Sequence, residues 1–230
     1  MQQSYKKALY INAKAGFFKP VRCLLIGGLL AMSAFTISHA AKAASPMVAK
    51  AGQVAEVLEQ VEPGLYQIDS THVAALFFIK HLGFSNYTGS FNNITGQLAF
   101  DNKKPENSKL EVRIDASSIQ VQSEELKNKL KGEDFFNVAR YGEITFTSTH
   151  IQKISDSKGK VTGNLRLLGV EKPITLDVVF NAAGGNPFSG KKVLGFSATG
   201  KINRSDFGMK ALLPAVGDEV SLRLEAEFVR

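Results

Sequence analysis

Three side chains that together could carry out acyl transfer lie close in the sequence, at Asp69, Ser70 and His72. A serine nucleophile, a histidine base and a carboxylate that orients the base are the components of a hydrolase triad. The chain has no Gly-x-Ser-x-Gly segment, the setting of such a serine in many hydrolases. Short polar residues are also common where a strand starts. We therefore expect a structural role here, and a lipid-ester hydrolase that uses His72 with Asp69 stays an alternative.

Other acid–base or metal chemistry has little support in the sequence. The histidines after position 43 are His72, His81 and His150. His72 and His81 are nine residues apart, which puts them on opposite faces of a regular strand and does not suit one shared metal ion. The acidic pairs at 124–125 and 133–134 fit the first turn of a helix and a solvated loop. We predict no catalytic residue, no metal site and no cofactor.

The segment 202–209, INRSDFGM, combines an arginine and an aspartate with apolar neighbours. In an extended strand Arg204 and Asp206 would point to the same side. One hypothesis is an ion pair or a hydrogen-bonding corner that closes the domain. The other is that Arg204 contacts the polar headgroup of a ligand while Phe207 and Met209 contact its apolar tail.

The first 43 residues have the features of a secretory signal peptide. Basic residues precede the uncharged run Leu24 to Ile37, and two cleavage patterns with small residues, Ser38-His39-Ala40 and Ala41-Lys42-Ala43, follow it. The run is shorter than the roughly 20 apolar residues that cross a membrane comfortably. We therefore predict cleavage after Ala43, export to the periplasm and no stable membrane span in the mature chain.

Removal of residues 1–43 changes the charge of the chain. The whole chain has 28 basic and 21 acidic residues, and this segment holds six of the former and none of the latter, which leaves a net charge of +1. A nearly neutral protein without a basic stripe is not expected to bind nucleic acid. The single cysteine, Cys23, also lies in this segment, so we expect neither disulfides nor thiolate chemistry in the mature chain.

From residue 65 onward, alternation of apolar and polar residues predicts one strand after another. The clearest segments are 94–101, 109–115 and 219–229. Similar segments lie at 66–69, 73–81, 87–91, 143–149, 161–169, 175–180 and 194–202. About eight or nine antiparallel strands in an all-β chain indicate a barrel or a sandwich. We assign residues 65–230 to one such domain and residues 44–64 to an N-terminal tether.

Residues 73–79, VAALFFI, are apolar on both faces of the predicted strand. One row consists of Val73, Ala75, Phe77 and Ile79, and the other of Ala74, Leu76 and Phe78. In a barrel one row would face the interior and the other would need cover. The single helix that we predict, residues 123–131 with Ser123 as its N-cap and Gly132 at its end, is a candidate for that cover.

A series of segments, in order along the chain, resembles the YceI family of bacterial periplasmic proteins. The segments are YQID at 66–69 with His72, FFIKHLGFSNYTGSF at 77–91, FD at 100–101, DASSI at 115–119, EDFFNVARYGEITFTST at 133–149, GNLRLLGVEKPITL at 163–176, INRSDFGM at 202–209 and VGDEV at 216–220. The resemblance implies an extended lipocalin-like antiparallel barrel with one short helix. It also implies a long apolar lumen that binds a polyisoprenoid or another amphiphilic lipid without catalysis. The chain departs from the family pattern at Gln120, Val121 and 126–130, which puts any polar role of those positions in doubt.

We therefore predict an exported, non-catalytic protein that holds a long-chain isoprenoid or fatty amphiphile for carriage, storage or stress response, with homodimerisation left open. Eight strands enclose an interior that either fills with side chains or holds one small ligand. The predicted ligand-binding residues are Val73, Ala75, Phe77, Ile79, Phe91, Phe100, Phe135, Phe136, Phe146, Arg204, Phe207 and Met209. The alternative is an interaction or stress protein whose barrel is filled and whose outer surface is functional.

Overall fold

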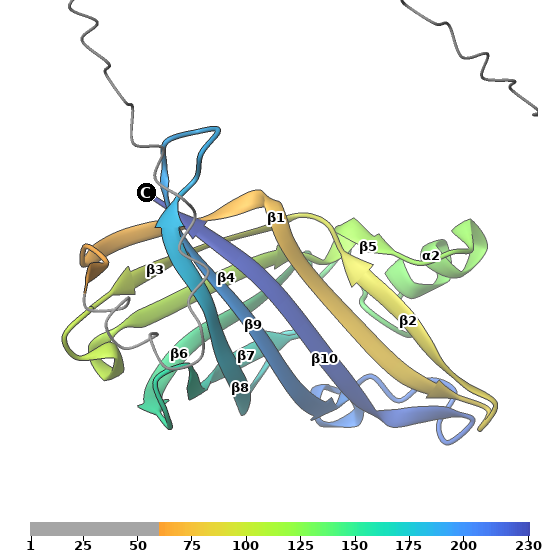
Figure 1. Cartoon of the computed structure of the whole chain (residues 1–230). Coiled ribbons are helices and arrows are strands. Elements are labelled where there is room, and N and C mark those ends of the chain that lie inside the picture. The colour runs from red at the N-terminus through yellow and green to blue at the C-terminus, as the bar shows by residue number, and fades with distance from the viewer. Residues whose placement is uncertain (1–59) are drawn as a thin grey trace, which may run out of the picture. The chain divides into compact units, whose positions relative to one another are not determined.

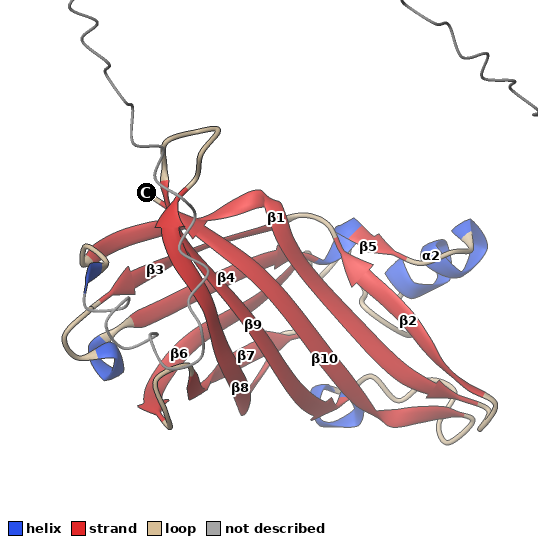
Figure 2. Ribbon diagram, viewed as in Figure 1, coloured by secondary structure: helices blue, strands red, loops and turns tan. Residues whose placement is uncertain are grey.

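Ten strands form one antiparallel sheet in residues 60–230, the part of the chain that the computed structural model describes (Figures 1 and 2). The sheet closes on itself because β10 pairs with β1, and the ring runs β1, β3, β4, β6, β7, β8, β9, β10. The predicted all-β barrel of about eight strands is confirmed. The predicted signal peptide, 1–43, and most of the predicted tether lie outside the described residues. No helix within residues 60–230 is long and apolar enough to cross a membrane.

The elements follow one another closely along the chain. The strands are β1 (Gly64–His81), β2 (Ser85–Phe91), β3 (Ile94–Phe100), β4 (Lys109–Asp115), β5 (Ile119–Gln120), β6 (Glu143–Lys153), β7 (Lys158–Leu167), β8 (Val170–Gly185), β9 (Lys192–Asn203) and β10 (Val216–Val229). The helix is α2 (Glu124–Lys131), and the short 3-10 helices are η1 (Pro105–Asn107), η2 (Ala116–Ser118) and η3 (Arg204–Phe207).

The alternation along each strand decides which side chains enter the barrel. On β10, Val220, Leu224 and Phe228 lie opposite Ile202, Ala198 and Leu194 of β9, so the apolar rows of the two strands share one face. Two clusters of buried side chains occupy the interior. One includes Tyr66, Leu98, Phe100, Phe180 and Phe228, and the other includes Phe91, Ile119, Ile144, Phe146 and Phe207. Burial of these rows provides the main hydrophobic stabilisation of the sheet.

Strand β1 changes partners halfway along its length. Its first residues, from Gly64 to Gln67, pair with β3, whereas residues from Ala75 to His81 pair with β2. Its pairing with β10 shows a register shift between Ile68 and Val73, which is an irregularity of the β-bulge type. The bulge turns Asp69 and His72 toward each other on β1.

The two ends of the barrel domain are tied together beside β1. Arg230 donates a hydrogen bond from Nη1 to the carbonyl of Pro63 at 2.7 Å, and the hydroxyl of Tyr66 donates to the carbonyl of Glu62 at the same distance. The Glu62 carboxylate also pairs with Lys192 of β9, which lowers the pKa of that carboxyl. These contacts fix the first residues of β1 against the ends of β9 and β10.

Helix α2 begins and ends where the sequence predicts. The Ser123 hydroxyl accepts a hydrogen bond from the Leu126 amide at 3.2 Å, and Gly132 terminates the helix. The helix packs mainly against β5 at one end of the barrel, and its Leu130 joins the second buried cluster (Figure 1). The helix does not lie over Ala74, Leu76 and Phe78, the outer row of β1, which it was expected to cover. Phe78 of that row is half-buried and lies opposite Thr88 of β2.

Candidate ligand-binding cavity

The barrel encloses a cavity of about 340 Å³. This volume lies at the lower end of the range, roughly 300 to 1,000 Å³, that ligand pockets span. On β10 the lining extends from Val220 to Phe228, so the cavity is elongated along the strands rather than round. An elongated cavity suits a chain-like ligand better than a compact one.

The cavity wall consists almost entirely of apolar side chains, most of them in the inward rows of the ring strands. Examples are Ile94, Leu98, Leu110, Val112, Ile144, Val161, Leu165, Leu176, Phe180, Phe196, Leu222, Leu224 and Phe228. The polar residues of the lining are those of the β6–β7 turn, from Gln152 to Gly159, together with Ser108, Ser197, Arg204 and Glu225. Ser108, just before β4, accepts a hydrogen bond from the Asp101 amide at 3.0 Å. Among the described residues, no buried side-chain nitrogen or oxygen lacks a hydrogen-bond partner. A ligand inside the barrel would therefore be held by apolar contact.

The structure places nine of the predicted ligand-binding residues around this cavity. They are Val73, Ala75, Phe77, Phe91, Phe100, Phe136, Phe146, Arg204 and Met209. They come from strands far apart in the sequence and meet because the ring closes. Phe77 and Phe146 both lie on the cavity wall and not on the solvent side.

The other three predicted residues lie outside the lining. Phe207 is 2% exposed and belongs to the second buried cluster, because η3 turns its ring into the packed end of the barrel. Phe135 is also buried, in the turn that follows α2. Ile79 keeps the parity of the inward row of β1 but is not part of the lining; it lies opposite Val220, where the lining of β10 begins. These three residues do not line the cavity, and a role for them in ligand binding stays a prediction.

Many of the wall residues were not among the predicted ones. Rows such as that of Ile94 and Leu98 on β3 are visible in the sequence as alternating apolar residues of a strand. These residues could have been found by taking the apolar row of every predicted strand, and not only that of residues 73–79, as facing the interior. The prediction took aliphatic side chains mainly from one strand, β1, and aromatic side chains from the others, whereas aliphatic side chains form most of the wall.

Arg204 is 3% exposed, and its guanidinium is surrounded by backbone carbonyls. Nε donates to Gly217 at 2.8 Å, Nη1 donates to Ala211 at 2.8 Å and to Met209 at 3.3 Å, and Nη2 donates to Val216 at 3.0 Å. Burial lowers the pKa of Arg204 from its usual value. The guanidinium therefore serves as a buried clamp that holds the loop between β9 and β10.

The extended conformation expected for the segment around Arg204 is wrong. Residues 204–207 form η3, which leaves Asp206 exposed and unable to share a strand face with Arg204. The carboxylate near η3 is Asp218, which accepts hydrogen bonds from the Ser205 amide at 2.8 Å and the Ser205 hydroxyl at 2.6 Å. These bonds lower the pKa of Asp218. Of the two hypotheses, the geometry matches a hydrogen-bonding corner rather than a headgroup contact.

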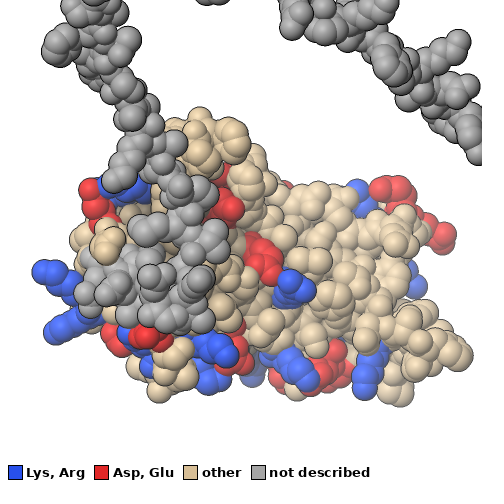
Figure 3. All heavy atoms as spheres, in the orientation of Figure 1, with Lys and Arg blue, Asp and Glu red and all other residues tan. Residues whose placement is uncertain are grey.

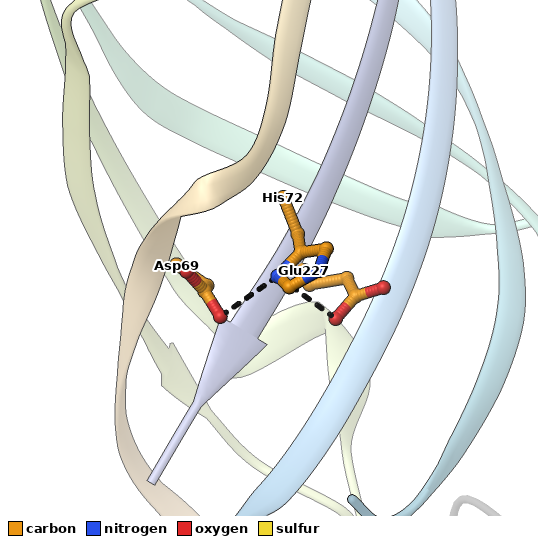
Figure 4. A group of neighbouring side chains, drawn as sticks. All are labelled: Asp69, His72 and Glu227. Atoms are coloured by element: carbon orange, nitrogen blue, oxygen red, sulfur yellow. Dashed lines mark hydrogen bonds and ion pairs between the residues drawn. The ribbon is translucent and has the colours of Figure 1, made fainter. Parts of the chain in front are cut away.

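Asp69 and His72 meet at the bulge of β1, but they do not form a hydrolase triad (Figure 4). The Nδ1 atom of His72 lies 3.1 Å from Oδ2 of Asp69 and 4.0 Å from Oε2 of Glu227. Asp69 also accepts hydrogen bonds from the amide and hydroxyl of Thr71, which lower its pKa to about 2. Hydrogen bonding to Asp69, with Glu227 nearby, raises the pKa of His72. The imidazole is thus engaged by carboxylates rather than by Ser70.

This group lies on the outer face of the barrel. Glu227 alternates with Ala226 and Phe228, both of which line the cavity, so its side chain points away from the interior. The three potential ligand atoms of Asp69, His72 and Glu227 lie within 4.8 Å of one another, close enough to contact one cation. None of the three residues belongs to the cavity lining.

The sequence and fold of this chain are similar to those of known proteins. A model of the YceI-like domain matches residues 66–228. The chain belongs to the YceI family. Protein YceI of Escherichia coli O17:K52:H18 is 38% identical over 167 residues, which cover 72% of this chain and 86% of that protein. Protein YceI of Salmonella arizonae gives the same identity and coverage.

Solved structures agree with membership of the YceI family. The Campylobacter jejuni YceI protein is 35% identical, with a TM-score of 0.58 over 66% of this chain and 89% of that one. BcnA of Burkholderia cenocepacia shares the fold, with 22% identity and a TM-score of 0.64 over 70% of this chain and 98% of that one. A polyisoprenoid binding domain from Saccharophagus degradans also shares the fold, with 14% identity and a TM-score of 0.54 over 73% of this chain and 99% of that one.

Proposed function

We propose that this YceI-family protein is an exported, non-catalytic carrier that holds the chain of a polyisoprenoid or another long amphiphilic lipid inside its barrel. The observation that carries the proposal is the elongated apolar cavity, within which the buried polar side chains already have partners. Burial of a hydrocarbon chain in such a cavity is favourable without any polar contact. The Saccharophagus degradans domain named for polyisoprenoid binding has the same fold, which supports this class of ligand.

The apolar character of the cavity wall also indicates how well the carrier distinguishes chains of different length. Apolar walls distinguish neighbouring chain lengths by only about 1 to 3 kcal/mol per methylene. We therefore propose that the protein accepts a family of related chains rather than one compound. The export signal predicted for residues 1–43 supports a site of action in the periplasm, where such chains would need a carrier between membranes.

Mass spectrometry of organic extracts from the purified, exported protein tests the proposal. An unrelated exported barrel, purified in the same way, provides the control for adventitious lipid. We expect one long-chain species, or a short homologous series, in stoichiometric amount. An empty extract, together with failure to take up a fluorescent fatty or isoprenoid probe, would end the carrier proposal in favour of a protein that acts through its surface.

A cavity-filling variant makes the test specific for the lumen. Ala198 lines the cavity, so Ala198→Phe is expected to occupy it and to reduce probe uptake at least tenfold. Ala99 is an exposed alanine on β3, whose neighbours Leu98 and Phe100 point into the barrel, so Ala99→Phe adds the same ring outside. Equal uptake by the two variants would show that the probe binds elsewhere.

A further inference from the structure

Four large apolar side chains are exposed together at one end of the barrel. Leu82 and Phe84 lie in the β1–β2 turn and are 53% and 88% exposed, and Leu212 and Leu213 lie in the β9–β10 loop and are 52% and 36% exposed. We call these four residues the apolar tip. Single exposed apolar residues are ordinary on protein surfaces, but grouped ones mark interaction sites.

The apolar tip is one fixed surface, although two segments distant in the sequence build it. The Leu82 amide donates a hydrogen bond to the Ala215 carbonyl at 2.8 Å, and His81 pairs with Val216 of β10. The Val216 amide in turn donates to the Leu212 carbonyl at 2.8 Å. In Figure 1 the β1–β2 turn and the β9–β10 loop come together at the lower right end of the barrel.

Two of the four residues have a backbone conformation that leucine rarely adopts. The φ angles of Leu82 and Leu212 are 52° and 62°, in the left-handed region that favours glycine and asparagine. Asparagine at these exposed turns would relieve the strain and improve solubility. Leucine is unfavourable on both counts, and strained residues of this kind concentrate at functional surfaces.

The two segments that carry the apolar tip contain only basic charges, and the acidic residues that flank the second segment are Asp206 and Asp218, of which Asp218 accepts hydrogen bonds from Ser205. Residues 79–87 and 208–216 contain Lys80 and Lys210, both exposed, and no aspartate or glutamate. In Figure 3 the lower right extremity shows neither acidic nor basic atoms, and charged atoms of both signs lie next to it. Lysine ammonium groups above an apolar base are complementary to phosphate headgroups above acyl chains, and each contributes favourably near an anionic bilayer.

We propose that the apolar tip docks the barrel onto the surface of an anionic membrane, with Phe84 and the three leucines inserted among the lipid chains and the two lysines at the headgroups. The protruding shape of the turn favours insertion into a bilayer, whereas a protein partner would require a recess to receive Phe84. Side chains of this type at a lipid interface bind through their buried apolar area together with charge.

The docking surface also adjoins the cavity. Met209 lines the cavity, whereas Leu212 and Leu213, in the same loop, face outward. One loop therefore separates the docked membrane from the end of the lumen. Docking itself is independent of what the lumen holds, but exchange of lipid across this loop rests on the proposed function.

The absence of tryptophan from the chain allows a direct test. Phe84→Trp places a single fluorophore at the tip, and Phe188→Trp places one in the β8–β9 turn, where Phe188 is 97% exposed at the opposite end of β9 and β10. Both are titrated with vesicles of phosphatidylcholine that contain phosphatidylglycerol, and with vesicles of phosphatidylcholine alone. We expect a blue shift and quenching by brominated lipid for Phe84→Trp on anionic vesicles, and no change for Phe188→Trp.

A second set of variants removes the tip and leaves the fold intact. Leu82→Asn and Leu212→Asn suit the left-handed backbone, and together with Phe84→Gln they are expected to weaken vesicle binding at least tenfold without lowering the melting temperature. Phe188→Gln is the matched control and should bind as the wild type does. Failure of wild type to bind anionic vesicles, or unchanged binding by the triple variant, would overturn the proposal. A dimer that the triple variant abolishes, without vesicle binding by wild type, would also overturn it and assign the tip to self-association.

Lipid uptake by the same variants is measured separately, with a monomeric fluorescent lipid and no vesicles. The triple variant should take up this probe as the wild type does. Loss of vesicle binding with normal uptake identifies docking as a property of the tip. Normal vesicle binding with no uptake by wild type would leave docking in place and remove the carrier function.

Discussion

The rings of Phe77 and Phe91 meet inside the barrel across the β1–β2 pair, with their centroids 6.0 Å apart. Phe91 also packs edge-on against Phe136, with centroids 5.5 Å apart. The Phe77 ring lies over Gly89, where an added Cβ would come within 2.3 Å of its Cζ atom. The position of Phe77 at the cavity wall therefore depends on the lack of a side chain at residue 89.

Gly89→Ala is expected to destabilise the protein by about 1 to 3 kcal/mol, the usual cost of an overpacked interior, because the methyl group overlaps the Phe77 ring. Urea denaturation measures the change. Gly184→Ala is the control, since a Cβ there would meet no atom within 4 Å, and its stability should be unchanged or slightly raised. Equal stability of the two variants would mean that Phe77 is free to move.

Phe146→Trp distinguishes a cavity from a filled interior. Phe146 lines the cavity, so the larger indole can extend into it at a cost below about 1.5 kcal/mol. Its emission should change when a lipid enters. Phe207→Trp is the comparison, because Phe207 is buried but does not line the cavity, and overpacking there should cost about 1 to 3 kcal/mol. Similar costs at both positions, with emission at 146 insensitive to lipid, would support the filled barrel.

Arg204→Lys should lower the free energy of unfolding by on the order of 2 to 4 kcal/mol, because one ammonium group cannot replace a fork that serves four carbonyls. Thermal or urea denaturation gives the value. Arg113→Lys, at an exposed ion pair with Glu143, should change stability by less than about 0.5 kcal/mol. A stable Arg204→Lys variant with weakened lipid binding would instead identify a headgroup contact.

The Asp69–His72 pair predicts a window of pH dependence. The pKa of Asp69 is lowered to about 2, so its contribution to stability is present above the unfolded pKa, near 4, and is lost as the pH falls toward 2. The pKa of His72 is raised, so its contribution is complete below the unfolded pKa, near 6.5, and is lost as the pH rises through the folded pKa. The stability difference between wild type and Asp69→Asn should therefore be largest between about pH 4 and pH 6.5.

Urea denaturation of both proteins at pH 5 and pH 8 measures this difference. The effect is small, because His72 is largely exposed and water screens the pair. The control is the same comparison in a His72→Gln background, where the difference between pH 5 and pH 8 should disappear because Asp69 has lost its imidazole partner. A difference between wild type and Asp69→Asn that is the same at both pH values would contradict the pairing.

The features that could be predicted from the sequence are those that short-range patterns determine. Alternation in 94–101 and 219–229 predicts strands that the structure contains, and the Ser123 cap predicts the start of α2 correctly. The row of Val73, Ala75 and Phe77 also lies at the cavity wall, because parity along a strand is a local property.

The features that could not be predicted depend on residues distant in the sequence. η3 is held in place because carbonyl groups from residues 209–217 accept hydrogen bonds from the Arg204 side chain. No local sequence pattern predicts these acceptors. The bulge at Asp69 to His72 exists because β1 must pair with β10 over its whole length while it changes from β3 to β2 on the other side. The misplacement of Phe207 has the same origin, since an extended strand and a 3-10 turn aim its ring in different directions.

The pairing of β1 with β10, which closes the barrel, also affects the folding of the chain. These are the first and last of the described strands, so the edge of β1 stays unpaired until residues 216–229 are available. Contacts of such large sequence separation slow folding, and a free strand edge can recruit the edge of another chain. We therefore expect the chain to be most prone to aggregation before its final strand is available to pair with β1.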